Sequence, residues 1–383
     1  MSISEDEIAA LREREFPVTE RVCYLDHASL GPLPRTHVAA LTEAAEHLML
    51  TGDPIVPDTI AKLDEIRGLT ARLMNAQPED IALLTSTAQG LSLVAQGLDW
   101  REGDEVVTYE GEFPSVVLPW LQLRDRGVNV RFVEDRNHRF EAEDVEAQLG
   151  ERTRVVALSL VNFNHGFRAP LEEVGAMCRD RGIWFVVDVV QGLGVIPVDA
   201  ARLQADILSA QAYKHLLGGF GISICYCSPR VRRELRVSGA GWAGRERPLV
   251  SGTDFERPLA ADARRFEASQ PGFAAIRGFL ASLRLLIEQL PNGYQDRIAA
   301  LADELSDGLE EIGWDVVSSR RDGERSSIVS ATRPGLDLTA LHARASEQQI
   351  AFSLRAGAFR FAPHFYNTSD DLSQLLAFLA AAA

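Results

Sequence analysis

One lysine stands out in this 383-residue chain, because the chain contains almost no others. Lys62 and Lys214 are its only lysines, although Lys and Arg together number 39. Lys214 follows a short apolar run and precedes the glycine-rich segment 218–221. A desolvated lysine can form an imine with an aldehyde, which an arginine cannot do. We therefore expect the chain to need a reactive amine at this point.

A carboxylate upstream decides between this interpretation and an ordinary surface lysine. Residues 182–187 form a continuous apolar run that ends in Asp188, and Gln191 follows. Such a run is typical of a parallel strand buried on both faces, and open α/β sheets bind ligands at the carboxyl ends of their strands. An acid that keeps a pyridine nitrogen protonated, and a lysine that holds an aldehyde, are the equipment of an enzyme that uses pyridoxal phosphate, PLP.

These segments resemble the motifs of the class V aminotransferase family, which includes cysteine desulfurases, kynureninases and isopenicillin N epimerase-like proteins. The matching residues are Asp188-x-x-Gln191, Gln-Ala-Tyr-Lys214 and Gly-Gly-x-Gly221, and the resemblance spans nearly the whole chain. It implies PLP as cofactor and an amino acid as substrate. It also implies the α/β fold type I of PLP-dependent transferases, with a large domain around a seven-stranded, mostly parallel sheet and a small C-terminal α+β domain. We expect residues 16–290 to form the large PLP-binding domain, and residues 1–15 and 291–383 to form the small one.

Hydroxyl groups stand at the start of a predicted helix, directly after the short apolar segment 81–84. The free N–H groups and the dipole of a helix start attract anions. Alone, the segment is ordinarily a helix cap. Beside Lys214 and Asp188, the resemblance implies that Ser86, Thr87 and Ala88 bind the cofactor's phosphate.

The resemblance implies further contacts with the cofactor. Phe113 is expected to stack on the pyridine ring, where desulfurases have histidine and kynureninases phenylalanine; a core phenylalanine is the alternative. An amide is expected at the ring hydroxyl, from Asn162 or, because the alignment is ambiguous by one residue, from Asn164. The complete expected cofactor-binding set is Ser86, Thr87, Ala88, Phe113, Asn162, Asp188, Gln191, Gln211, Tyr213, Lys214 and Ser269. Gln211 and Tyr213 are expected to reach the phosphate, and Ser269, unless it is a helix cap, the phosphate in the other subunit of a homodimer.

An arginine near the C-terminus is the main candidate for binding the substrate. Arg360 precedes a Tyr-Asn-Thr turn in a segment that resembles the family's binding site for the substrate carboxylate; a surface arginine is the alternative. A guanidinium can grip a carboxylate through two hydrogen bonds. Arg355 is the weaker candidate, because on one continuous strand it would face the opposite side. The resemblance adds His27, for which a hydrogen bond to nearby backbone is the alternative, and Trp242 in a glycine-rich loop.

The resemblance implies that the substrate forms an external aldimine and that Lys214 then removes the Cα proton while Asp188 supports the ring. We expect aminotransferase or C–S/β-lyase chemistry, with isopenicillin N epimerase-like racemisation or epimerisation as the alternative. A nucleotide-dependent oxidoreductase is disfavoured, because the possible dinucleotide turn 192–194 lacks a third glycine.

Cysteine desulfurases carry a cysteine-bearing loop just before the arginine that corresponds to Arg360. Here only residues 356–359 separate Arg355 from Arg360, and none of the four cysteines (Cys23, Cys178, Cys225 and Cys227) falls there. We therefore predict that the enzyme forms no persulfide. The spacing of Cys225-x-Cys227 is not that of a zinc or redox site, so no metal is expected.

Composition limits the possible partners. The net charge of −16 argues against binding nucleic acid or an anionic membrane. The acidic N-terminus does not resemble a signal peptide, and the apolar tail is too short to span a bilayer. We expect a cytoplasmic protein, and the resemblance implies a homodimer with shared active sites.

Overall fold

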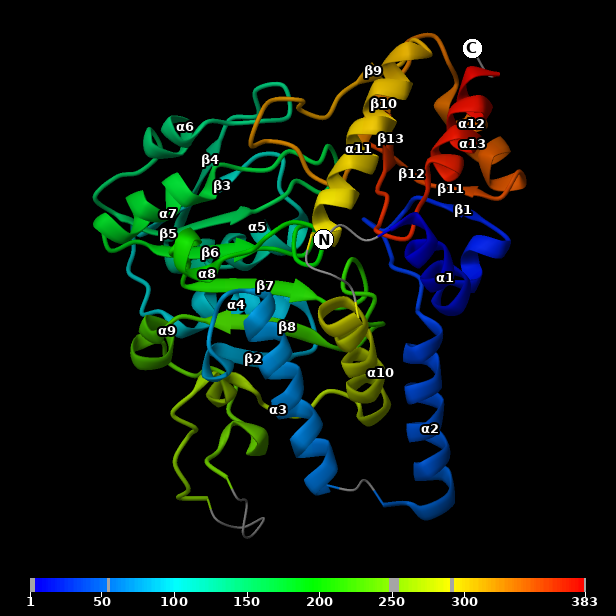
Figure 1. Ribbon diagram of the computed structural model, residues 1–383. Helices are drawn as coiled ribbons and strands as arrows, with labels where there is room; N and C mark the ends of the chain where they lie inside the picture. The colour runs from blue at the N-terminus through cyan, green and yellow to red at the C-terminus, as the bar shows by residue number, and fades with distance from the viewer. Residues whose placement is uncertain (1–3, 54–55, 248–254, 290–292, 382–383) are drawn as a thin grey trace.

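A seven-stranded sheet forms the centre of the computed structural model, which describes residues 4–53, 56–247, 255–289 and 293–381 (Figure 1). Its strand order is β2-β8-β7-β6-β5-β3-β4. The strands are β2 (Ile81–Leu84), β3 (Glu105–Tyr109), β4 (Asn129–Val133), β5 (Thr153–Ser159), β6 (Trp184–Asp188), β7 (Ile207–Gln211) and β8 (Ser223–Cys227). β8 runs antiparallel to β2 and β7, and the remaining pairs are parallel. The predicted fold, α/β with a mostly parallel seven-stranded sheet, is confirmed.

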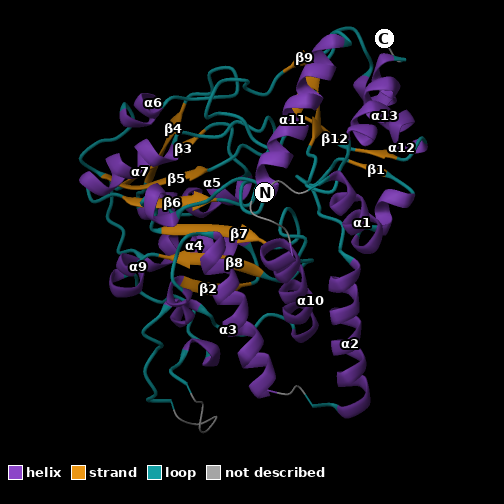
Figure 2. Ribbon diagram, in the orientation of Figure 1, coloured by secondary structure: helices purple, strands orange, loops and turns teal. Residues whose placement is uncertain are grey.

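Both faces of this sheet are buried, as its continuous apolar strands predict. Phe185 and Val187 pack in one hydrophobic cluster, whereas their neighbours Trp184 and Val186 pack in another. The first cluster is covered by α3 (Val56–Leu73), α7 (Leu171–Asp180) and α10 (Phe273–Arg284), and the second by α4 (Thr87–Gly97), α5 (Pro114–Leu121) and α9 (Pro229–Glu234) (Figure 2).

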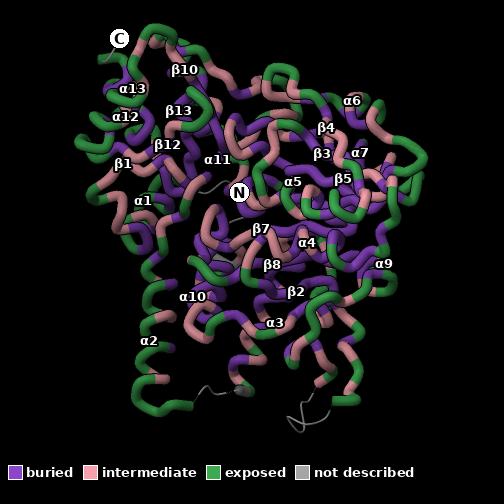
Figure 3. Tube along the Cα trace, turned by 180° about the vertical axis from the view of Figure 1, so that it is seen from behind, coloured by how far each residue is buried: buried purple, intermediate pink, exposed green. Residues whose placement is uncertain are grey.

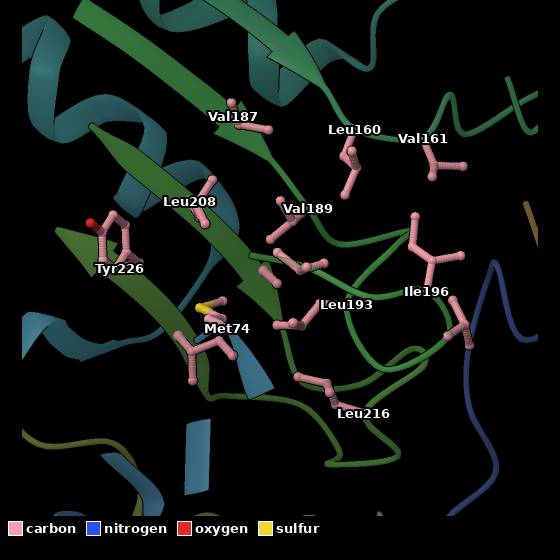
Figure 4. Packing of buried hydrophobic residues seen from close by; sticks show 14 of the residues in the cluster. Met74, Leu160, Val161, Val187, Val189, Leu193, Ile196, Leu208, Leu216 and Tyr226 are labelled. Carbon is pink, nitrogen blue, oxygen red and sulfur yellow. The ribbon is translucent and has the colours of Figure 1, made fainter. Parts of the chain in front are cut away.

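The first cluster continues beyond the strand ends into the turns that follow. Val189 and Leu193 after β6, and Leu216 after β7, lie in the same cluster as Leu208 of β7 (Figure 4). Apolar side chains that pack in the core anchor the backbone of these turns, and this fixes the positions of the polar residues in the same turns.

The C-terminal region forms a second, smaller layer. Its four-stranded antiparallel sheet has the order β12-β13-β10-β9, with β9 (Asp315–Val316), β10 (Val329–Thr332), β12 (Ser353–Arg355) and β13 (Ala358–Phe361). The helices α11 (Tyr294–Glu311), α12 (Leu338–Glu347) and α13 (Ser369–Ala380) pack against it around their own apolar cluster.

The start of the chain joins this C-terminal layer. β1 (Cys23–Tyr24) pairs in parallel with β11 (Ile350–Ala351), and Asp26 bridges to Ala362. In α1 (Glu5–Glu15), Arg12 forms an ion pair of 2.5 Å with Asp371. The division of the chain at residues 16 and 291 stays a prediction.

Helix α2 (Arg35–Thr51) projects from the body of the molecule (Figure 3). It packs on α10 along one face, but Met49 and Leu50 near its end are 75% and 78% exposed. Short helical segments elsewhere include α6 (Ala142–Glu146), α8 (Ala200–Leu203), a π-helical turn at Leu285–Gln289 and several 3-10 turns. Within the described part of the chain, no helix is long and apolar enough to cross a membrane.

Candidate active site

The ends of several strands and helices surround a cavity of about 110 Å³. Asp188 ends β6, Gln211 ends β7, and Lys214 lies in the turn that follows β7. Nine of the predicted cofactor-binding residues line this cavity: Ser86, Thr87, Ala88, Phe113, Asp188, Gln191, Gln211, Tyr213 and Lys214. The fold thus brings together residues that are more than 120 positions apart in the sequence, because parallel strands end at one edge of the sheet.

Lys214 has the environment of a reactive amine. The pKa of its ammonium group is lowered to about 8, mainly by burial; Asp188 opposes this shift, and the charges of Arg360 and Arg355 contribute to it. Its Nζ lies 5.8 Å from the centroid of the Phe113 ring. A larger fraction of this amine is therefore unprotonated near neutral pH than for an exposed lysine.

Asp188 is a buried carboxylate with few partners. It is 4% exposed, and its Oδ1 accepts one hydrogen bond of 2.8 Å from the N–H of Val190. Burial raises its pKa to about 6, and the Val190 N–H and Lys214 oppose this shift. A carboxyl group in such a site favours a cation beside it, and a protonated pyridine nitrogen is such a cation.

The N-terminus of α4 offers a fitting site for a phosphate. Ser86 caps the helix and accepts a hydrogen bond of 3.1 Å from the N–H of Gln89. The hydroxyl of Thr87, the first residue of the helix, is buried without a hydrogen-bond partner. An unpaired buried hydroxyl beside free helix N–H groups is what a bound phosphate would satisfy, so the residues present fit the cofactor.

Close packing fixes the position of this helix start. A Cβ atom at Gly90 would lie 2.3 Å from Oγ of Ser209 on β7, and that hydroxyl donates a hydrogen bond of 3.2 Å to the carbonyl of Thr87. A glycine is needed at position 90 so that α4 can lie directly against the sheet.

Two aromatic rings meet at the cavity. Phe113 and Phe163 both line it, with ring centroids 5.0 Å apart and planes at 78°. Phe163 was not among the predicted site residues, although it lies in the polar segment directly after β5. Its carbonyl accepts a hydrogen bond of 2.6 Å from Nη1 of Arg360, which connects the aromatic wall to the C-terminal layer.

The two asparagines that were candidates for the ring hydroxyl are absent from the lining of the cavity. The side chain of Asn162 donates to the carbonyl of Gly111 at 2.8 Å and accepts from the N–H groups of Asn164 and His165. It therefore shapes the turn after β5. Contact of either asparagine with the cofactor stays a prediction.

Arg360 is buried and already has several partners. Its Nη2 donates to Oγ of Ser29 at 2.6 Å and lies 3.5 Å from the carboxylate of Asp26. Its Nε is buried without a partner. Burial lowers the pKa of this guanidinium, and Asp26 opposes the shift.

The segment before Arg360 is a hairpin and not one strand. Ala356 and Gly357 have φ angles of 47° and 78°, as in a two-residue turn of type I′, and they join β12 to β13. Ser353 is paired with Arg360, and Arg355 with Ala358, so Arg355 and Arg360 lie on the same face. The expectation of opposite faces rested on a continuous strand and is wrong.

Three other predicted residues are absent from the lining of the cavity. His27 is fully buried, with Nδ1 2.8 Å from the carbonyl of Ala362 and Nε2 2.7 Å from the hydroxyl of Tyr366. Burial lowers its pKa to about 4. Trp242 is 51% exposed in a short 3-10 helix, and Ser269 is also exposed.

The structure adds a half-buried acid that the sequence reasoning missed. Glu112 accepts hydrogen bonds from both the N–H and the hydroxyl of Ser159, the first of them 2.6 Å long. Ser159 lines the cavity and is paired with Asp188 across β5 and β6. Burial raises the pKa of Glu112 to about 7. Its place between the end of β3 and Phe113 was the only available signal.

All four cysteines are buried, without disulfides, and none lines the cavity. Cys225 and Cys227 lie on one face of β8, with sulfur atoms 3.9 Å apart. Across the described ranges, no group of three or more His, Cys, Asp or Glu side chains could hold a metal ion.

Comparisons with known proteins identify the family of the chain. The family profile described as Aminotransferase class-V matches residues 23–372. A probable cysteine desulfurase of Methanothermobacter thermautotrophicus is 28% identical, over 94% of this chain and 95% of its own length. An uncharacterized aminotransferase of Bacillus subtilis, YcbU, is 24% identical over 96% of each chain.

A solved structure shows the same architecture. The apo cysteine desulfurase of Thermococcus onnurineus NA1 superposes with a TM-score of 0.86 at 25% identity, and the match covers 100% of this chain and 98% of that one. The mutant cystine C-S lyase C-DES with glycine covalently linked to its PLP cofactor has a TM-score of 0.89 at 24% identity, over 97% and 99% of the two chains.

Proposed function

The chain belongs to the class V aminotransferase family of PLP-dependent enzymes, and we propose that it removes the Cα proton of an amino acid and completes transamination or C–S/β-elimination without an enzyme persulfide. One observation carries the proposal: the β12–β13 hairpin presents Arg360 and Arg355 on one face, near enough for their charges to lower the pKa of Lys214, and its two-residue turn leaves no room for a cysteine-bearing loop.

The cofactor, when bound, supplies an electron sink for the carbanion that forms at Cα. Asp188 would hold the ring nitrogen, and Thr87 and the first N–H groups of α4 would hold the phosphate. Phe113 would pack on the ring face. Gln191, Gln211, Tyr213 and Ala88 complete the proposed cofactor-binding set in this cavity.

Lys214 is the proposed base. With its lowered pKa, the free amine of Lys214 would be able to accept a proton from Cα near neutral pH. The protonated amine can then return the proton to a neighbouring carbon or to a leaving group. This shared proton transfer is compatible with both transamination and elimination.

Arg360 and Arg355 are the proposed binding groups for the substrate carboxylate. The unpaired Nε of Arg360 is a free donor, and Arg355, on the same face, is exposed. A guanidinium and a carboxylate in a partly desolvated site form a charge-assisted hydrogen bond.

Epimerisation by two bases receives less support. Among the described residues that line the cavity, the ionisable groups are Asp188, Tyr213 and Lys214. Asp188 is assigned to the ring nitrogen, and burial raises the pKa of Tyr213, so Tyr213 is a poor base at neutral pH. One competent base remains, which favours transamination or elimination.

The proposed assembly is a homodimer in which each subunit completes the other's site. The exposed apolar end of α2 is a candidate contact surface, and neither Trp242 nor Ser269 reaches the cavity of its own subunit. Dilution into the monomer range should then weaken PLP retention. Monomers that hold PLP as tightly as dimers would contradict the shared site.

The test is a panel of L-amino acids offered to the holoenzyme in D₂O, with Cα–H exchange followed by NMR. A substrate should exchange its Cα hydrogen, and exchange should be lost in Lys214→Ala but kept in the matched control Lys62→Ala. Release of ammonia with a 2-oxo acid identifies a lyase, whereas transfer of the amino group to an added 2-oxo acid identifies a transaminase. Racemised amino acid as the sole product would contradict the proposal.

A further inference from the structure

A buried histidine directly after the catalytic lysine is tied to Gln191 and takes no part in the chemistry described above. Nε2 of His215 lies 3.0 Å from Oε1 of Gln191, and Nε2 of Gln191 lies 2.9 Å from the carbonyl oxygen of Ala28. Gln191 and His215 are 2% and 1% exposed. These contacts connect the turn after β6, the lysine turn and the loop that follows β1.

The chemistry of the carbonyl group determines how the amide is oriented. A carbonyl oxygen only accepts hydrogen bonds, so the atom of Gln191 that faces Ala28 must be the amide nitrogen. The amide oxygen then faces His215, and that oxygen also only accepts. The ring nitrogen Nε2 of His215 must therefore carry a proton.

The opposite ring nitrogen is consistent with this assignment. Burial lowers the pKa of His215 well below its usual value, so the ring is neutral and carries a single proton. Its Nδ1 is buried without a hydrogen-bond partner. A proton on Nδ1 would be left unpaired there, and two acceptors would face each other across 3.0 Å on the other side.

We propose that His215 is a positioning residue that locks the side-chain amide of Gln191, so that its second Nε2–H is available as a donor to the bound cofactor. Gln191 lines the cavity together with Lys214 and Asp188, and its nitrogen has one hydrogen left after the bond to Ala28. Without the histidine the amide can rotate and present its oxygen instead. This inference rests on the proposed function for the identity of the ligand, but its first test does not.

The C-terminal layer holds His215 from the other side. Nε2 of His364 lies 3.1 Å from the carbonyl oxygen of His215, and the ring of His364 stacks on that of His215 with centroids 6.1 Å apart. His364 follows β13, the strand that carries Arg360. The residue next to the catalytic lysine is thus fixed by the same segment that presents the substrate-binding arginine.

The first test reads the tautomer in the wild-type chain without cofactor. Two-bond ¹H–¹⁵N spectra of the eight histidines, with His215 assigned by its absence in His215→Gln, should show a neutral ring protonated at Nε2. A ring protonated at Nδ1, or a charged ring at pH 7, would overturn the proposal. Because this measurement needs no turnover, failure of the proposed enzymatic function would leave it unaffected.

The second test compares two substitutions by their affinity for added PLP. His215→Gln can still place a donor where Nε2 stands, whereas His215→Phe fills the space without one. We expect His215→Phe to weaken PLP binding about tenfold, the loss of one buried hydrogen bond, and His215→Gln to stay within about twofold of wild type. If both variants bind PLP equally well, or His215→Phe matches wild type, His215 does not position Gln191. Thermal unfolding of both variants separates a general loss of stability from this pattern.

Discussion

The floor and the rim of the cavity are built in different ways. The floor consists of residues at the ends of long buried strands and at a helix start, such as Asp188 and Thr87. What we call the rim is the pair of segments that contact the lining residues Phe163 and Tyr213, namely the β12–β13 hairpin and the loop after β1. They carry Arg360, Asp26 and Ser29, which hold one another by side-chain contacts. The floor is therefore fixed by the core of the large sheet, whereas the rim depends on a few polar bonds between segments far apart in the chain. We expect changes to the floor to affect the chemical step and changes to the rim to affect substrate binding.

The largest effect is expected from Lys214→Ala, which removes the only amine of the floor. Turnover should fall at least ~10³-fold, because a general base and the covalent link to the cofactor are both lost. Borohydride should no longer attach PLP to the chain, which mass spectrometry can show. Lys62→Ala is the control, and labelling at Lys62 in the wild type would contradict the assignment.

Replacing Asp188 with asparagine should raise the stability of the cofactor-free protein but lower its turnover as a holoenzyme. The pKa of Asp188 is raised from 3.8 to about 6 in the folded protein, so binding a proton at this carboxyl group favours the folded state. This contribution to stability is complete below pH 4 and is lost as the pH rises through 6. By that shift, the cofactor-free variant should be more stable than wild type by about 3 kcal/mol at pH 8, with no difference below pH 4. Turnover should fall ~10²–10³-fold, as for loss of a buried electrostatic partner.

Urea unfolding of both cofactor-free proteins at the two pH values measures this difference. A stability gap that is the same at pH 4 and pH 8 would show that the buried charge of Asp188 is not its cause.

At the rim, Arg360→Ala should raise KM with PLP still bound. The expected loss is about 2–4 kcal/mol of substrate binding, as for a desolvated charge pair. Arg355→Ala is the matched comparison on the same face; because Arg355 is exposed, its loss should cost only about 0.2–1 kcal/mol. An unchanged KM in Arg360→Ala would contradict its role as the carboxylate-binding group.

The smallest effect is expected from replacing all four cysteines. A variant with alanine in place of all four cysteines should keep the turnover number of the wild type, because each cysteine is buried and none lines the cavity. Truncating four buried side chains should lower the melting temperature of the variant, so turnover is compared at a temperature at which both proteins are folded. A sulfur adduct on any cysteine of the wild type during turnover with cysteine would overturn this expectation.

The floor was largely predictable from the sequence and the rim was not. A continuous apolar run predicts a buried strand, and its last residue then marks the ligand edge, which is how Asp188 and the helix start at Ser86 could be found. The rim depends on contacts between distant segments. β1 and β11 have two residues each, too few for a periodic pattern, and the turn Ala356-Gly357 lacks the Asn-Gly signal of a tight hairpin.

Two residues at or beside the cavity were missed for a related reason. Phe163 and Glu112 act through what they touch: the guanidinium of Arg360 in one case and the hydroxyl of Ser159 in the other. Arg360 and Ser159 are far in the sequence from the residues that they contact, so composition and spacing could not predict these contacts. Asn162 was singled out in the same segment as Phe163, but its side chain is engaged in the turn.

Gly31, in the rim loop, donates its N–H to the carbonyl of Tyr213 at 2.8 Å, and a Cβ atom there would lie 2.2 Å from the carbonyl oxygen of Lys214. Because the obstructing atom belongs to the backbone, no side-chain rearrangement could relieve the clash. In a library with every residue substituted in turn, position 31 should therefore be as intolerant as position 214, although glycine has no group that could react. Intolerance at position 31 would then reflect close contact between two backbone segments. A search that identifies catalytic residues by intolerance alone would wrongly include this glycine.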